Sequence, residues 1–133
     1  LLPGCSNDPQ AQIAATTLPV YEFTVRLCEG TGISVTRLVT EEVSCLHDYS
    51  LKTAQMRAIE GAQLVVISGG GLEDFMQDIV PADKTIDASC NIELECGHDH
   101  DGHNHEHDPH IWLSPVHAAT MAEIASGVAW NIL

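Results

Sequence analysis

Five histidines lie within ten consecutive residues near the carboxyl end of the chain: His98, His100, His103, His105 and His107. Imidazole is a common ligand of zinc, nickel and copper, so this tract can chelate a metal ion without a preformed cage. The surrounding segment 93–108 holds six acidic residues and a single large apolar one, Leu94, so it cannot bury a core. We therefore expect a mobile loop that binds metal weakly, because ordering it costs conformational entropy. A purification tag is the alternative, although tags are usually uninterrupted and terminal.

His110 and His47 lie in less polar surroundings. His110 belongs to the segment Asp-Pro-His-Ile-Trp-Leu at 108–113, and His47 lies between Leu46 and Asp48. A single histidine in a loop is most often a surface residue, so neither position alone predicts a ligand. Together they could give zinc two neutral imidazole donors, which still leaves a tetrahedral site incomplete.

The spacing of apolar residues predicts strands alternating with helices. Strand patterns cover 12–17, 33–38, 64–68 and 85–88, and helix patterns cover 19–29, 51–60, 72–79 and a run from 115 onward. We expect Ser50 to cap the second helix and Ser114 to cap the last. This alternation predicts an α/β fold, with an open, mostly parallel four-stranded sheet and helices on both faces.

Ligands of such sheets bind beyond the carboxyl ends of the strands. The loops at 17–18, 40–49 and 69–71 and the segment around His110 all lie at those ends of the predicted strands. This topology could bring His47 and His110 together, although they are far apart in the sequence.

Four segments resemble, in the right order, the zinc- and manganese-binding solute-binding proteins of bacterial ABC importers (solute-binding protein family 9). A histidine-rich loop between the last two is typical of the zinc-specific branch. The segments are AATTLPVY at 14–21, HDY at 47–49, AQLVVISGGGLE at 62–73 and DPHIWLSP at 108–115.

This resemblance implies that residues 12–133 form one α/β metal-binding lobe, the amino-terminal lobe of a two-lobed protein. It implies His47 and His110 as primary metal ligands, with the five tract histidines as an auxiliary site. Residues 115–133 would begin the helix that joins the lobes. The remaining ligands, a histidine or glutamate and a carboxylate, would come from the second lobe and have no counterpart here. Ser114 also departs from the family, which commonly has aspartate there.

Residues 1–11 are expected to form a flexible tail. Its Leu-Pro-Gly-Cys at 2–5 resembles a bacterial lipobox, which would make Cys5 a lipidation site. Pro3 is unusual in that motif and no apolar stretch precedes it, so a free cysteine in the tail is the alternative. An even number of other cysteines suggests disulfides in an exported protein, but the sequence does not choose a pairing among Cys28, Cys45, Cys90 and Cys96.

The formal net charge of −14 repels nucleic acid and anionic lipid and attracts cations. We therefore expect no nucleic-acid partner, and contact with a membrane only through a lipid anchor at Cys5. No apolar run approaches the roughly 20 residues of a membrane span. The sequence also lacks the signatures of serine hydrolases, phosphate loops, dinucleotide sites and zinc proteases, so we expect no enzyme.

The leading hypothesis is extracytoplasmic, lipid-anchored zinc binding, as part of the capture component that delivers metal to the membrane subunit of an ABC importer. We expect Zn²⁺ rather than Mn²⁺, although the sequence does not decide the ion bound in vivo. The alternatives are a histidine-rich metal buffer or metallochaperone that serves no importer, and a structural domain that binds metal incidentally. A homodimer could complete the metal site. A monomer that completes it with water or its own loop is the competing outcome.

Overall fold

The computed structural model describes residues 12–41, 46, 49–94 and 108–132, and of 128–132 only the backbone. Its four strands form one sheet in the order β2-β1-β3-β4, and every pairing is parallel. Three short 3₁₀ turns, η1 to η3, accompany three α-helices. In chain order the elements are β1 (Ile13–Ala15), α1 (Leu18–Cys28), β2 (Val35–Arg37), α2 (Thr53–Gly61), β3 (Leu64–Ile67), η1 (Asp74–Met76), η2 (Ala82–Lys84), β4 (Thr85–Asp87), η3 (Ile111–Leu113) and α3 (Pro115–Ile132).

The two central strands, β1 and β3, are buried on both faces of the sheet. All three residues of β1 are inaccessible to solvent, as are Val65 and Val66 of β3. Successive side chains of a strand point to opposite faces, so Val65 and Val66 pack into two different apolar clusters. Short, continuous apolar runs such as these suit parallel strands that are covered by helices on both sides.

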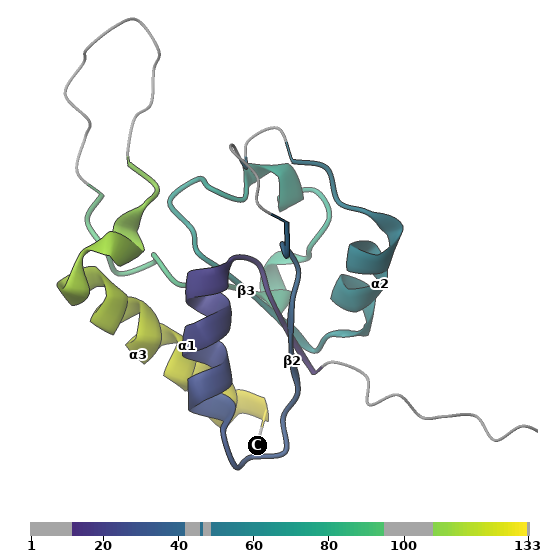
Figure 1. Ribbon diagram of the computed structural model, residues 1–133, viewed down its shortest axis with the longest axis horizontal. Helices are drawn as coiled ribbons and strands as arrows, with labels where there is room; N and C mark the ends of the chain where they lie inside the picture. The colour runs from purple at the N-terminus through teal and green to yellow at the C-terminus, as the bar shows by residue number, and fades with distance from the viewer. Residues whose placement is uncertain (1–11, 42–45, 47–48, 95–107, 133) are drawn as a thin grey trace, which may run out of the picture.

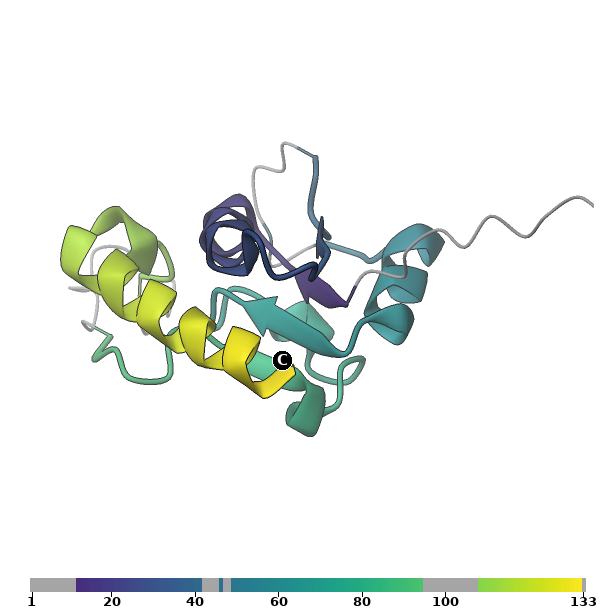
Figure 2. The same ribbon diagram turned by 90° about the horizontal axis from the view of Figure 1, so that it is seen from below.

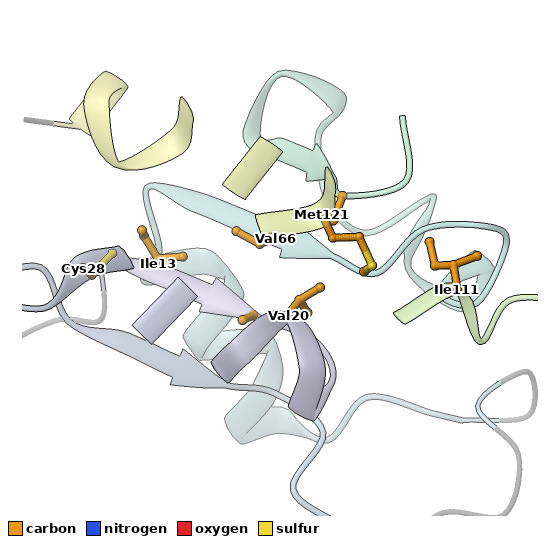
Figure 3. Packing of buried hydrophobic residues seen from close by; sticks show 8 residues of the cluster. Ile13, Val20, Cys28, Val66, Ile111 and Met121 are labelled. Atoms are coloured by element: carbon orange, nitrogen blue, oxygen red, sulfur yellow. The ribbon is translucent and has the colours of Figure 1, made fainter. Parts of the chain in front are cut away.

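Helices α1 and α3 cover one face of the sheet, where they lie side by side (Figures 1 and 2). Val20 and Cys28 of α1, Met121 of α3 and Ile111 of η3 belong to the larger apolar cluster, together with Val66 of β3 (Figure 3). Burying these side chains removes apolar surface from water, which is the main force that holds the layers together. None of the helices that the structure describes is long and apolar enough to cross a membrane.

Helix α2 covers the opposite face. Its Ile59, together with Ala62 and with Met76 of η1, packs against Ala14 and Val65 of the central strands. With α1 and α3 on the first face, this arrangement confirms the predicted open parallel sheet with helices on both faces.

The predicted helix over 72–79 is wrong. Only the 3₁₀ turn η1 forms there, and the amides of Met76, Gln77 and Ile79 donate to carbonyls three residues earlier. The apolar spacing is real, since Leu72 and Met76 are buried. However, the Glu73 carboxylate accepts from the backbone amides of Ser68 and Gly69. These hydrogen bonds hold the segment in a 3₁₀ turn instead of an α-helix.

The two expected serine caps have different outcomes. Helix α2 begins after Lys52, whose amide donates to Gln55 Oε1 at 2.7 Å, so the cap predicted at Ser50 is wrong. The Gln55 side chain, in the first turn of the helix, takes the capping role that was expected of the serine. Helix α3 begins at Pro115, and the Ser114 hydroxyl accepts from the His117 amide at 3.5 Å, so the predicted cap at Ser114 is confirmed.

Of the cysteines that the structure describes, Cys28 and Cys90 are both free thiols. Cys28 is buried in the larger apolar cluster, and burial raises the pKa of its thiol. Cys5, Cys45 and Cys96 lie outside the described residues, as do the tail 1–11 and the histidine tract. The disulfides suggested for Cys28 and Cys90 are therefore wrong, whereas a pairing of Cys45 with Cys96 and the lipidation site remain predictions.

Candidate metal centre

The carboxyl ends of the strands form one edge of the sheet, and short polar residues follow three of them. Thr17 after β1 and Ser68 after β3 share a buried hydrogen bond of 2.7 Å between their hydroxyl oxygens. Ser89 after β4 accepts from the Gly70 amide at 3.0 Å. Beyond β2, the Val39 amide donates to the Thr16 carbonyl at 2.9 Å, so the segment that leads to His47 leaves from this same edge.

A buried carboxylate, that of Glu73, joins the two central strands at this edge. Its Oε1 accepts from the Thr16 hydroxyl at 2.5 Å and from the Ser68 amide at 2.8 Å, while Oε2 accepts from the Gly69 amide at 3.0 Å. Burial raises the pKa of Glu73 despite these hydrogen bonds, each of which acts to lower it, and the nearby Asp87 carboxylate raises it further. Glu73 was not among the site residues predicted from the sequence. The one signal for it was an acidic residue shortly after a glycine turn, within a run of apolar residues at helical spacing.

The turn at 69–71 consists of three glycines, and its backbone conformation favours glycine. Gly69, Gly70 and Gly71 all have positive φ, of 81°, 65° and 81°. A Cβ on Gly69 would collide with the Asp87 carboxylate, and one on Gly70 would lie 3.7 Å from Cα of Pro109. The turn therefore brings backbone close to both β4 and the segment that carries His110.

His110 is the one primary ligand candidate that the structure describes, and its side chain is 56% exposed. Its Nδ1 lies 2.8 Å from Asp108 Oδ1, and its backbone amide donates to the same oxygen at 2.9 Å. These two hydrogen bonds lower the pKa of Asp108. The Trp112 ring packs edge-on against the imidazole, with centroids 5.3 Å apart.

This arrangement suits a metal ligand. A carboxylate that accepts from Nδ1–H fixes the tautomer and leaves the Nε2 lone pair free to bind a metal ion. The His110 ring is thus held at the molecular surface, in an orientation that allows Nε2 to bind a metal ion.

A small hollow of about 140 Å³ lies beside His110. It lies between Leu94 and Asp108, the two described residues that flank the histidine tract, and a second imidazole from His117 on α3 also lines it. Sequence analysis did not single out His117, because its place depends on where α3 begins. Within the described part of the chain, no three His, Cys, Asp or Glu side chains lie close enough to hold a metal ion.

The other predicted ligands cannot be placed. His47 and the five tract histidines lie outside the described residues, so their proximity to His110 stays a prediction. The described residues thus supply one oriented imidazole beside a polar edge of the sheet.

Comparison with known proteins identifies the chain's relatives. The family described as "ZnuA: Zinc-uptake complex component A periplasmic" matches residues 13–127. The chain belongs to this family. Its members are solute-binding proteins of transport systems, so the predicted family is confirmed.

Two curated ZnuA-family relatives carry zinc in their names. The zinc-binding lipoprotein AdcA of Streptococcus pneumoniae is 33% identical over 140 residues, covering 92% of this chain. The zinc-binding protein AdcA of Streptococcus pyogenes serotype M3 is 28% identical over 139 residues, covering 87% of this chain. The chain spans only 28% and 27% of the lengths of these two relatives.

Solved structures give the same picture of the fold. The Zn(II)-bound ZnuA-like domain of Streptococcus pneumoniae AdcA superposes with a TM-score of 0.72 at 28% identity, covering 90% of this chain and 43% of that one. The metal-dependent lipoprotein YcdH of Bacillus subtilis gives a TM-score of 0.74 at 25% identity, with the same coverage of 90% and 43%. The described fold thus corresponds to less than half of each structure.

Proposed function

We propose that this ZnuA-family chain binds zinc outside the cytoplasm, as part of the substrate-capture component of an ABC metal importer. The observation that carries the proposal is the geometry of His110. Its imidazole is exposed at the carboxyl edge of a parallel sheet, and the Asp108 carboxylate orients it through Nδ1, so Nε2 is the nitrogen that would bind the metal ion. The names of the AdcA relatives support zinc as the ion rather than manganese. We propose no catalytic activity.

In this proposal His47 joins His110 as a primary ligand. Support comes from the topology, because β2 lies beside β1 and the chain leaves β2 for His47 at the same sheet edge. Two imidazoles leave tetrahedral zinc two ligands short. We infer that the missing ligands come from a second lobe, since the chain spans 43% of the zinc-bound AdcA structure.

The histidine tract has an auxiliary role in this proposal. Deleting 97–106 should lower the number of zinc ions bound per chain and leave the tightest site intact. The deletion should also leave folding intact, because the tract has almost no apolar side chains to bury. Calorimetric titration with zinc measures the number of sites and the affinity of each.

The same titration tests the rival function of a histidine-rich buffer or metallochaperone that serves no importer. Loss of all zinc binding on deletion would support the buffer, because that protein would depend on the tract alone. A matched control replaces the five tract histidines by asparagine and keeps the length of the segment. This control separates the effect of losing the imidazoles from the effect of shortening the segment.

A second copy of the chain is the other possible source of the missing ligands. Near His110, Leu113 and Val116 are exposed by 75% and 73%, and Leu18 at the edge of the sheet is exposed by 48%. Exposed apolar groups close together tend to mark interaction sites. A twofold dimer would cover them and could bring two His110 imidazoles to one zinc ion. Sedimentation showing a monomer both with and without zinc would rule out the dimer.

We also infer an extracytoplasmic location, with 1–11 as a tail lipidated at Cys5 and the lobe at 12–133. The description of the Streptococcus pneumoniae relative as a lipoprotein supports the anchor. Metabolic labelling with a fatty-acid analogue tests it. A Cys5→Ala chain that still takes up the label would count against lipidation at this cysteine.

A further inference from the structure

Glu73 is a buried acid with no direct access to a metal ion. It is 4% exposed, and its two carboxylate oxygens accept from the Thr16 hydroxyl and the amides of Ser68 and Gly69. Apolar Ile67, Met76 and Val80 line the hollow next to it. An acid buried so deeply needs a reason, because removing a charge from water is costly.

The hydrogen bonds of Glu73 lead to His110 through the glycine turn. Glu73 holds the amides on the β3 side of the turn, and the Ser89 hydroxyl holds the Gly70 amide at 3.0 Å on the other side. Gly70 in turn faces the backbone of Pro109, the residue before His110. Two polar side chains therefore fix the surface on which the ligand-bearing segment rests.

We propose that Glu73 is a positioning residue of the metal site, which sets the place of His110 by fixing the glycine turn behind Pro109. This inference rests on the proposed zinc function only for its effect on affinity. The structural link from Glu73 to His110 is independent of any metal ion.

Glutamate suits this role better than glutamine, because both of its oxygens accept. In a Glu73→Gln chain, the amide oxygen can still accept from Thr16 and Ser68, but the NH₂ group would face the Gly69 amide, donor against donor. The Gly69 amide would lose its acceptor, and the turn would shift.

The same substitution has two opposing effects on the stability of the fold. A neutral glutamine removes the burial penalty of the charge, which is the main cause that raises the pKa of Glu73. The Gly69 amide loses its acceptor at the same time, which destabilises the folded chain. The melting temperature therefore serves only to show that the variant is folded, and the positioning role is tested by the His110 resonances.

The experiment compares the chain with its Glu73→Gln and Ser89→Ala variants. Ser89→Ala removes the partner of the Gly70 amide without touching Glu73, and so tests the turn from its other side. Glu22→Gln is the matched control, since it removes the same charge from an exposed position on α1. The readouts are the NMR resonances of His110 in the metal-free chain, the melting temperature, and the zinc affinity.

We expect both turn variants to shift the His110 resonances and to weaken zinc binding about tenfold, as is typical when support of a metal ligand is lost. Both turn variants should still melt cooperatively as folded chains, and Glu22→Gln should match the parent chain in all three readouts. His110 resonances that stay in place in both variants would overturn the inference. If the parent chain binds no zinc but the resonances still shift, the proposed function fails while the positioning role stands.

Discussion

Replacement of His110 by alanine is expected to abolish the stabilisation of the chain by zinc. A ligand that binds only the folded form stabilises it by about 2.7 kcal/mol at a hundredfold excess over its dissociation constant. For a chain of this size that is a rise in melting temperature on the order of 10 °C. Without the His110 imidazole, the site keeps no ligand from the described residues, and the rise should disappear. Thermal melts with and without zinc near neutral pH measure it.

Two further variants make this result specific. Asp108→Asn keeps an acceptor near Nδ1 but removes the charge, so it should weaken zinc binding about 10- to 100-fold and reduce the rise without abolishing it. His117→Ala removes the other imidazole from the same hollow and should retain most of the rise. The ligand assignment would be contradicted if His110→Ala kept the full zinc-induced rise in melting temperature and His117→Ala lost it.

The sheet could be predicted from the sequence because its central strands are short apolar runs. The run 64–68 is continuously apolar up to its final serine and is followed directly by three glycines, which predicts a buried parallel strand. The alternation of strand and helix patterns along the chain predicted that helices cover both faces of the sheet. These inferences depend on local patterns, which the sequence displays directly.

The 72–79 segment shows where local patterns are insufficient. Leu72, Phe75, Met76 and Ile79 have helical spacing, but the path of the segment is decided by Glu73, which binds Thr16 across 57 residues of sequence. Nothing within the segment reveals a partner on another strand. The same long-range hydrogen bond therefore explains both why Glu73 is buried and why no α-helix forms here, because it overrides local helix propensity.

The sequence indicated His110 as a candidate ligand, but it did not indicate which other side chains lie beside it. His110 was recognisable from the segment around it, and Asp108 could be anticipated as a neighbour. His117 was not, because its place beside His110 depends on the path of the chain through η3 into α3. A histidine seven residues away in the sequence reaches the same hollow only after the fold is known.

Among the described glycines with positive φ, Gly69 should be the least replaceable. Gly69→Ala would place a methyl group against the Asp87 carboxylate and the Ser89 hydroxyl, in a backbone conformation with φ of 81°. Gly30→Ala has nearly the same φ, 77°, but its Cβ would meet nothing within 4 Å. The pair therefore separates backbone strain, which both variants share, from collision, which only Gly69→Ala suffers.

Strain alone costs about 1–2 kcal/mol, so Gly30→Ala should lose that much unfolding free energy. Gly69→Ala should lose about 3 kcal/mol or more, because relieving the collision means moving β4 or the turn, and either movement breaks hydrogen bonds at the sheet edge. Urea unfolding of both variants measures the difference. Equal losses would mean that β4 yields easily, and the glycine turn could not then be the rigid support that His110 requires. The stability of Gly69→Ala thus tests the same edge of the sheet on which the metal site depends.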